Sequence, residues 1–191
     1  MRSSANTPNP RRNGALRLLV VLAREDHPKA CTGRRLLRWG RVAPVPWDDA
    51  RSPTPVVLDP YAPTPLSTAD RKVAEDGGVL VVDCSWNRLA ARGTFPGARV
   101  AGRSHGVRRR LPFLIATNPQ HYGRVAQLNT VEAFSAAAYL LGRGEQAAQL
   151  TEGFRGEEEF LPVNRDRLDR YRAATGPEGV REVERTLFGG P

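Results

Sequence analysis

Cysteine, histidine and long apolar runs are all scarce in this chain of 191 residues. Its two cysteines, Cys31 and Cys84, stand in different contexts, which argues against a disulfide framework or a four-ligand zinc site and favours a reducing, cytoplasmic setting. The three histidines do not follow metal-ligand spacing, so we expect no metal ion. No apolar run approaches the length of a membrane span, so we expect no membrane partner.

Several catalytic motifs are absent as well. The sequence contains no P-loop and no G-x-G-x-x-G after a predicted strand, which excludes the usual phosphate cradles of nucleotide hydrolases and dinucleotide-binding folds. It also has no nucleophile elbow, so a hydrolytic triad is not supported. The chain is nevertheless long enough to bury a sizeable core without disulfides.

Positive charge is concentrated in the first part of the chain. Residues 1–110 carry 20 Lys and Arg against 9 Asp and Glu, whereas residues 111–191 carry 9 against 11. A one-sided positive field suits a polyphosphate partner, most often RNA. Only two of the basic residues are lysines, so a compositional origin of the arginine bias stays open. The arginines that we expect to contact RNA are Arg34, Arg35, Arg88, Arg92, Arg103, Arg108, Arg109 and Arg110.

The pattern of apolar runs and capping residues predicts an α/β fold. We expect a disordered basic tail over residues 1–13, an N-terminal α/β lobe over 14–110 that faces RNA, and a C-terminal lobe over 111–191. Capping boxes at Ser67–Asp70 and Asn129–Glu132 each predict a helix start. Residues 92–110, rich in glycine and arginine, predict a mobile loop. The predicted strands are 17–22, 56–58, 79–83 and 112–116, and the predicted helices begin near 34 or cover 68–76, 130–141, 144–153, 164–174 and 178–187.

The strand at residues 79–83 ends in the most informative segment, Asp83-Cys84-Ser85-Trp86. Ligands of open α/β sheets bind at the carboxyl ends of strands, so this edge offers a carboxylate and a flat apolar wall to a ligand. The alternative is a capped strand end beside a core tryptophan. Other candidate lining residues follow neighbouring strands or the loop after the first one, and they suit a nucleoside-containing cosubstrate held by backbone and apolar contacts.

A series of segments in fixed order resembles a known family. Cys31-Thr32-Gly33, Val81-Val82-Asp83-Cys84-Ser85-Trp86, Leu111-Pro112-x-Leu114 and Asn118-Pro119-x-x-Tyr122-Gly123 are its main parts. Together with Leu66-Ser67-x-Ala69-Asp70 and Leu128-x-x-Val131-Glu132-Ala133, this set resembles the Tsr3 family of ribosome-maturation aminocarboxypropyltransferases over roughly residues 17–174. Thr68 and His121 depart from the family pattern, which leaves the exact acceptor open.

The resemblance implies a SPOUT-like fold with a C-terminal trefoil knot. It also implies S-adenosylmethionine-dependent transfer of a 3-amino-3-carboxypropyl group to N3 of an N1-methylated pseudouridine in small-subunit rRNA or a pre-ribosomal particle. By the same resemblance Asp83 faces the acceptor, Thr32 meets the ribose, and Leu58, Pro60 and Trp86 bury the sulfonium methyl. A carboxylate near the weakly acidic N3–H could accept its proton, so we predict that Asp83 is the base, with orientation alone as the alternative role. The backbone groups implied to bind adenosine belong to Val82, Leu114, Asn129 and Ala133.

Alternative functions remain open from the sequence. One is a methyltransferase of the same fold, and another is an rRNA-binding assembly factor without catalytic activity. A small-molecule acceptor in place of RNA is a further alternative. We expect the protein to be a monomer.

Overall fold

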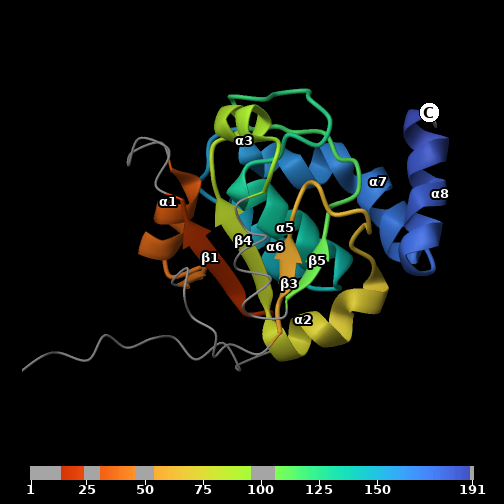
Figure 1. Ribbon diagram of the computed structural model, residues 1–191, viewed down its shortest axis with the longest axis horizontal. Coiled ribbons are helices and arrows are strands. Elements are labelled where there is room, and N and C mark those ends of the chain that lie inside the picture. The colour runs from red at the N-terminus through yellow and green to blue at the C-terminus, as the bar shows by residue number, and fades with distance from the viewer. Residues whose placement is uncertain (1–13, 24–30, 46–53, 96–105, 190–191) are drawn as a thin grey trace, which may run out of the picture.

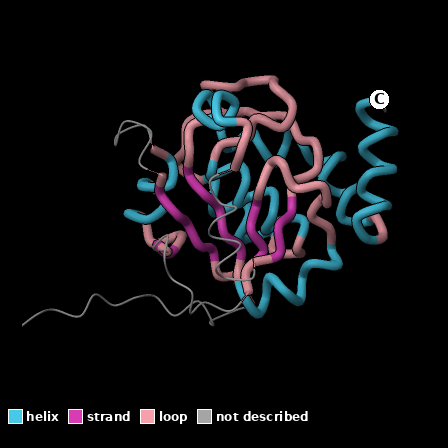
Figure 2. Tube along the Cα trace, viewed as in Figure 1, coloured by secondary structure: helices cyan, strands magenta, loops and turns pink. Residues whose placement is uncertain are grey.

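Five parallel strands form the central sheet, in the order β2-β1-β4-β3-β5 (Figures 1 and 2). The computed structural model describes residues 14–23, 31–45, 54–95 and 106–189, so the predicted tail at 1–13 lies outside the described residues. A parallel sheet with helical connections confirms the predicted α/β class. The strands are β1 (Leu18–Leu22), β2 (Ala43–Pro44), β3 (Val56–Leu58), β4 (Val79–Asp83) and β5 (Val107–Arg109).

Alternation along the strands divides the core between the two faces of the sheet. In β4, Val79 and Val81 belong to the larger cluster of buried residues, whereas Leu80 and Val82 belong to a smaller one on the opposite face. Successive side chains of a strand point to opposite faces, and all four are at most 6% exposed. The run of aliphatic residues in β4 therefore reflects burial on both sides, as predicted.

Helices from the second half of the chain cover the face with the larger cluster. Figure 1 shows α5 and α6 behind the sheet, with α7 and α8 farther from it at one side. Among the described residues, no helix is both long and apolar enough to cross a membrane. The helices are α1 (Thr32–Arg38), α2 (Arg71–Gly77), α3 (Trp86–Arg92), α5 (Thr130–Leu140), α6 (Gly144–Thr151), α7 (Phe160–Ala173) and α8 (Gly176–Phe188), with the 3-10 turns η1 (Thr68–Asp70) and η2 (Glu157–Glu159).

Both helix starts predicted from capping boxes are confirmed. At the start of α5, Asn129 accepts a hydrogen bond from the backbone N–H of Glu132, whose carboxylate accepts one from the N–H of Asn129. In the second box, before α2, the N–H of Ser67 donates to Asp70 at 3.1 Å, whereas the Ser67 hydroxyl makes no hydrogen bond to a described residue. These bonds satisfy backbone donors that have no partner within the first turn of a helix.

The predicted strand at residues 112–116 is wrong. Only an isolated bridge from Ile115 to Val125 forms there. Pro112 has no N–H to give to a sheet, and side chains take the backbone donors that follow. The N–H of Phe113 donates to Glu184 at 3.1 Å, and that of Ile115 donates to Asn164 at 2.9 Å. The segment is therefore held by side chains of α7 and α8 instead of by a neighbouring strand.

The predicted mobile loop at 92–110 is wrong at its two ends. Arg92 completes helix α3, which the sequence pattern does not predict, and residues 107–109 form β5 beside β3. Strand β5 is stabilised by backbone bonds such as that from the N–H of Val107 to the carbonyl of Pro55, at 2.9 Å. Residues 96–105 lie outside the described residues.

Candidate functional site

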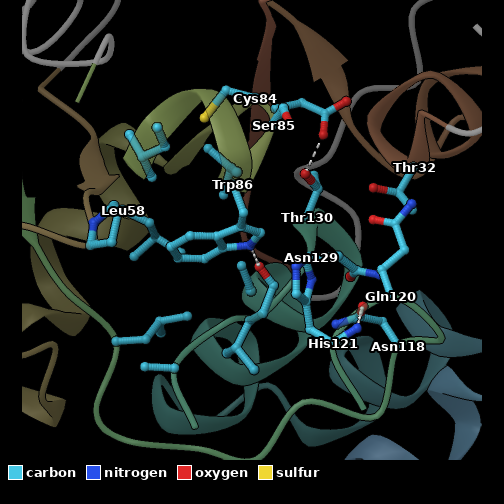
Figure 3. A pocket seen from close by; sticks show the side chains of 18 of the residues that line it. Thr32, Leu58, Cys84, Ser85, Trp86, Asn118, Gln120, His121, Asn129 and Thr130 are labelled. Carbon is cyan, nitrogen blue, oxygen red and sulfur yellow. Dashed lines mark hydrogen bonds between the residues drawn. The ribbon is translucent and has the colours of Figure 1, made fainter. Parts of the chain in front are cut away.

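A cavity of about 840 Å³ opens at the carboxyl ends of β3 and β4, where Leu58 and Asp83 end their strands (Figure 3). Helices α1 and α3, the start of α5, the loop 118–124 and turn η2 complete its wall. Small-molecule sites range over about 300–1,000 Å³, so the cavity can hold a nucleoside-sized ligand. It lies at the edge of the sheet that the sequence indicated.

One side of the cavity is apolar. Trp86 begins helix α3, and its indole extends towards Leu58 in Figure 3. The indole Nε1–H donates a 2.8 Å hydrogen bond to the carbonyl of Leu128, which fixes the plane of the ring. Pro60 and Leu89 are further apolar residues that line the cavity. A fixed aromatic plane beside aliphatic groups forms a wall for a flat, largely apolar ligand.

Asp83 joins three separate segments at the floor of the cavity. Its Oδ1 accepts a 2.6 Å hydrogen bond from the Thr130 hydroxyl, and its Oδ2 accepts bonds from the Cys31 thiol at 2.7 Å and the Gly33 N–H at 3.2 Å. The side chain is buried, with 8% of the residue exposed. The carboxylate therefore ties the start of α1 and the start of α5 to the end of β4.

Two neighbours of Asp83 show how closely this junction is built. A Cβ on Gly33 would lie 2.6 Å from Oδ2 of Asp83, which is closer than real contacts allow. Burial, followed by the hydrogen bond and negative charge of Asp83, raises the pKa of Cys31 to about 12. Cys31 is therefore a neutral donor to the carboxylate at physiological pH, and it is not an activated nucleophile.

A second buried carboxylate, that of Glu132, organises the loop beside the cavity. Glu132 is fully buried and accepts hydrogen bonds from the backbone N–H groups of Thr117, Asn118 and Asn129 at 2.6, 2.8 and 3.0 Å. It also accepts from the Asn118 side-chain amide at 2.7 Å. These bonds hold the start of the loop against the N-terminus of α5.

The loop 118–124 brings His121 to the cavity and Tyr122 to the surface. The N–H of His121 donates to Oδ1 of Asn118 at 3.0 Å, and both side chains appear on the polar side of the site in Figure 3. The Nδ1 atom of His121 is buried and has no hydrogen-bond partner among the described residues. Tyr122 is 74% exposed. The loop thus places the His121 imidazole at the cavity and the Tyr122 phenol in solvent.

Turn η2 contributes a third buried carboxylate. Glu157 is only 4% exposed and lines the cavity. Its Oε1 accepts a 2.7 Å hydrogen bond from the side-chain amide of Asn129, whereas its Oε2 is buried without a partner among the described residues. Burial raises the pKa of Glu157 to about 7, and the charge of Glu132 adds to this, against the opposing effects of Asn129 and Arg35.

The cavity gathers most of the predicted ligand-binding residues. One of them, Leu114, does not line it and is instead buried in the core. The carbonyl of Leu114 accepts from the N–H of Ala126 at 2.9 Å, so it is committed within the protein. The neighbouring Leu111, Pro112 and Phe113 do line the cavity, and the Leu114 backbone as an adenosine contact stays a prediction. The predicted residues that line it are Thr32, Leu58, Pro60, Val82, Asp83, Trp86, Asn129 and Ala133.

Three of the predicted RNA-binding arginines are engaged by carboxylates of the protein itself. The guanidinium of Arg110 makes a bidentate pair with Glu184 at 2.6 and 2.7 Å, and Arg109 contacts Asp70 at 2.9 Å. These bonds anchor β5 and the segment after it to other elements. They also reduce the positive charge that these residues offer to a phosphate. The three pairs are Arg108 with Asp59, Arg109 with Asp70 and Arg110 with Glu184.

The other predicted arginines differ in their surroundings. Arg35 lines the cavity, and its guanidinium lies 4.3 Å from the ring centre of Phe154 and donates to the carbonyl of Gly153. Arg34, Arg88 and Arg92 are exposed on α1 and α3. Arg103 lies outside the described residues. The described residues contain no group of three or more His, Cys, Asp or Glu side chains that could hold a metal ion.

Sequence reasoning missed Glu157 as a site residue and recognised Glu132 only as part of a capping box. Glu157 stands in a run of three glutamates, whose neighbours Glu158 and Glu159 are exposed. Such a run is typical of a solvated surface, so nothing in it singles out the buried member. The Asn129–Glu132 capping box could have indicated a larger hydrogen-bond network. Besides the two bonds of the box, the Asn129 amide can donate and the Glu132 carboxylate can accept further hydrogen bonds.

Comparisons with known proteins agree on one family. A family model described as the C-terminal part of a ribosome biogenesis protein matches residues 56–188. A 16S rRNA aminocarboxypropyltransferase of Methanopyrus kandleri is 40% identical over 173 residues, which cover 89% of this chain and 98% of that protein. An 18S rRNA aminocarboxypropyltransferase of Schizosaccharomyces pombe is 34% identical over 188 residues, covering 96% of this chain and 62% of that protein.

A solved structure shows the same relationship at the level of the fold. The SAM-dependent rRNA:acp-transferase Tsr3 from Vulcanisaeta distributa superimposes with a TM-score of 0.74 at 31% sequence identity. The match covers 92% of this chain and 99% of that one. The likeness therefore extends over nearly the whole of both proteins.

Proposed function

The chain belongs to the family of rRNA aminocarboxypropyltransferases, and from this premise we propose that it transfers the 3-amino-3-carboxypropyl group of S-adenosylmethionine to N3 of an N1-methylated pseudouridine in small-subunit rRNA. The observation that carries the proposal is the two-sided cavity. Trp86, Leu58 and Pro60 form an apolar side, and Thr32 and Asn129 lie on a polar side. S-adenosylmethionine is divided in the same way, because its nucleoside is largely apolar and its amino-acid arm is zwitterionic.

The residues of the cavity fit the cosubstrate by the chemistry of each side. Trp86, Leu58 and Pro60 would cover the adenosine and the sulfonium methyl, and Thr32 would bind the polar part. When bound, a sulfonium supplies electrophilic carbons, of which the methyl is intrinsically the most reactive. The protein must therefore direct attack to the arm by position alone. Burying the methyl against the apolar side leaves the amino-acid arm towards the polar side.

The transfer forms a bond from N3 of the acceptor to the arm carbon next to sulfur, breaks that carbon–sulfur bond and releases 5′-methylthioadenosine. The proton leaves N3, and the sequence predicts that Asp83 accepts it or orients the acceptor. Its hydrogen bonds to Thr130, Cys31 and Gly33 engage both carboxylate oxygens and hold Asp83 in place at the floor of the cavity, and the orienting role stays a prediction. Asp83 as a base stays a prediction.

Exposed arginines on α1 and α3 support RNA binding next to the cavity. Arg34 and Arg88 are exposed, and no ion pair engages either of them among the described residues. Arginines of this kind bind phosphates, which positions RNA without reading its sequence. We propose that the acceptor nucleotide enters the cavity between these two helices, with small-subunit rRNA or a pre-ribosomal particle as the partner.

Product analysis tests the proposal directly. The protein is incubated with small-subunit rRNA and S-adenosylmethionine labelled either in the methyl or in the carboxypropyl group. We expect carboxypropyl label in the RNA together with 5′-methylthioadenosine. Methyl label in the RNA with S-adenosylhomocysteine would establish a methyltransferase instead. Absence of cosubstrate binding by calorimetry would favour an assembly factor without catalytic activity.

Finer features of the prediction remain proposals. We propose a SPOUT-like C-terminal lobe with a trefoil knot, a division of the chain at residue 110, a monomeric state and a cytoplasmic location. The first of these is what the resemblance of the sequence motifs implies. Sedimentation equilibrium measures the oligomeric state.

A further inference from the structure

Glu157 has a carboxylate oxygen that the protein buries and leaves without a partner. The residue is 4% exposed, and Oε2 makes no hydrogen bond to any described residue. Leaving a buried acceptor unpaired costs roughly 1–3 kcal/mol, and more for a charged group. An arrangement this costly calls for an explanation, and Glu157 lines the ligand cavity.

The backbone and one neighbour fix Glu157 in this position. Gly156, with φ at 85°, turns the chain into η2, and the side-chain amide of Asn129 donates to Oε1 at 2.7 Å. Asn129 is fixed in turn, because it caps α5 and accepts a hydrogen bond from the backbone N–H of Glu132. One oxygen of Glu157 is therefore anchored by Asn129, and the other is buried without a hydrogen-bond partner among the described residues.

The other carboxylates that line the cavity have no such oxygen. Asp83 accepts bonds on both oxygens, from Thr130 on one and from Cys31 and Gly33 on the other. Asp59 is paired with Arg108 through one oxygen and accepts from the Tyr61 N–H through the other at 2.9 Å. Of the described carboxylates in this cavity, Glu157 alone has an oxygen without a partner.

We propose that Oε2 of Glu157 accepts a hydrogen bond from the α-ammonium of the cosubstrate's amino-acid arm. The inference rests on the proposed function and assigns a residue to the arm. A cationic donor compensates a buried carboxylate better than a neutral one does, because the two charges attract strongly where water is excluded. The imide N–H of the acceptor base is neutral, so it is the weaker candidate for this oxygen.

The charges around Glu157 make its ionisation depend on the ligand. Burial and the charge of Glu132 raise its pKa to about 7, whereas Asn129 and Arg35 act in the opposite direction. His121, Asp83 and Arg155 also line the cavity. A bound ammonium would favour the ionised carboxylate, so cosubstrate binding near neutral pH should release a proton.

The decisive experiment compares two ligands on two variants by isothermal titration calorimetry. Glu157→Gln retains the size of the side chain and the acceptor for Asn129, but it turns an amide N–H₂ towards the ammonium. Glu159→Gln is the matched control, because this neighbour in η2 is exposed. The ligands are S-adenosylmethionine and 5′-methylthioadenosine, which lacks the amino-acid arm.

We expect Glu157→Gln to weaken S-adenosylmethionine binding by about tenfold or more, the effect of losing a hydrogen bond to a charged group. Its affinity for 5′-methylthioadenosine should stay within about twofold of the wild-type value. Glu159→Gln should match the wild type with both ligands. Equal loss for both ligands would overturn the proposal, since it would indicate a general distortion of the cavity.

The pH dependence provides a second readout. With a pKa of about 7, lowering the pH from 7 to 6 should weaken wild-type binding by about fivefold, because ligand binding requires the ionised carboxylate. Above about pH 8 the ligand's own amine loses its proton and affinity should fall again. In Glu157→Gln the affinity should no longer weaken between pH 7 and pH 6. The same weakening in the variant as in the wild type would contradict the assignment.

The outcomes separate this inference from the proposed function. Failure of wild-type protein to bind S-adenosylmethionine would remove the proposed function itself. Normal binding by Glu157→Gln would remove only the ammonium assignment. Normal binding with a kcat reduced about 100-fold would indicate that Glu157 accepts the proton from N3, and would equally overturn the present proposal.

Discussion

The Thr130 hydroxyl donates a 2.6 Å hydrogen bond to Oδ1 of Asp83, and this bond joins the first turn of α5 to the end of β4. Two segments almost fifty residues apart thus meet at the floor of the cavity. Both residues line the cavity. Its energetic importance can be measured separately from any catalytic role.

Replacing Asp83 by Asn should lower the free energy of unfolding by about 1–3 kcal/mol. An amide has one acceptor oxygen, so it cannot serve Thr130 on one side and Cys31 and Gly33 on the other. Urea denaturation measures the change, and Thr130→Val should reproduce part of it. Transfer measured on folded Asp83→Asn then tests the catalytic prediction: a loss of about 100-fold with unchanged cosubstrate affinity would support a base.

The indole of Trp86 should contribute to ligand binding by its area more than by its hydrogen bond. Trp86→Ala removes the wall, and we expect S-adenosylmethionine to bind about 10–100-fold more weakly. Trp86→Phe keeps an aromatic plane and loses only the bond to the Leu128 carbonyl, so its effect should be clearly smaller. Calorimetry with both variants checks the order. Wild-type affinity in Trp86→Ala would disprove the wall.

The two cysteines should react at different rates in the folded protein. With its pKa raised to about 12, Cys31 is a thiolate in about one molecule in 10⁴ at pH 8, and it is also buried. Cys84 is partly exposed at the cavity. Alkylation with iodoacetamide followed by peptide mass spectrometry should therefore label Cys84 first. Equal labelling before denaturation would contradict the arrangement around Asp83.

Charge reversal should separate structural arginines from RNA-binding ones. Breaking the Arg110–Glu184 pair strands a buried carboxylate, so Arg110→Glu should destabilise the fold by about 3–5 kcal/mol. Arg88→Glu, at an exposed site, should leave stability within about 0.5 kcal/mol and should lower RNA affinity. The salt slope of RNA binding should fall by about 0.7 for each phosphate that the variant no longer neutralises. An unchanged slope in Arg88→Glu would place the RNA elsewhere.

The stability of the protein should carry a pH signature from Glu157. Because its pKa is raised from the usual 4.5 to about 7, the folded state binds this proton more tightly than the unfolded state. The free energy of unfolding should therefore fall as the pH rises from about 4.5 to 7, by up to about 3 kcal/mol from this group. In Glu157→Gln, which has no carboxyl group to titrate at this position, the free energy of unfolding should not show this part of the decrease with pH.

Urea unfolding of wild type and Glu157→Gln at pH 5 and pH 8 measures the difference. We expect the variant to be the more stable protein at pH 8 and similar to the wild type at pH 5. Glu159→Gln again serves as the control. If wild type and Glu157→Gln show the same dependence on pH, the carboxylate is not buried in the way described.

The sequence pattern correctly predicted the strands and helix starts that are determined by neighbouring residues. The aliphatic runs at 56–58 and 79–83 predicted two strands and the capping box at Asn129 predicted a helix start, and each is confirmed. The run at 112–116 looked equally apolar. Its backbone donors are taken by Asn164 and Glu184, which lie some fifty to seventy residues later, so only the tertiary structure reveals that no strand forms.

The site was predictable on the same terms. Asp83 and Trp86 follow a buried strand, and their place at the edge of the sheet could be inferred from that alone. The pairing of Arg108, Arg109 and Arg110 could not, because alternation along β5 says nothing about which carboxylates face it. Glu157 could not be distinguished from its neighbours because its burial depends on how η2 packs against α6 and on the hydrogen bond from Asn129.

The close approach of Gly33 to Asp83 means that substitution at one position constrains substitution at the other. A methyl group at position 33 would occupy the space of Oδ2, so any side chain there displaces the carboxylate. A lineage that keeps the aspartate must keep the glycine, and only one that has lost the aspartate becomes free to vary it. Across descendants of this gene the two residues should therefore disappear together, with the glycine never the first to go.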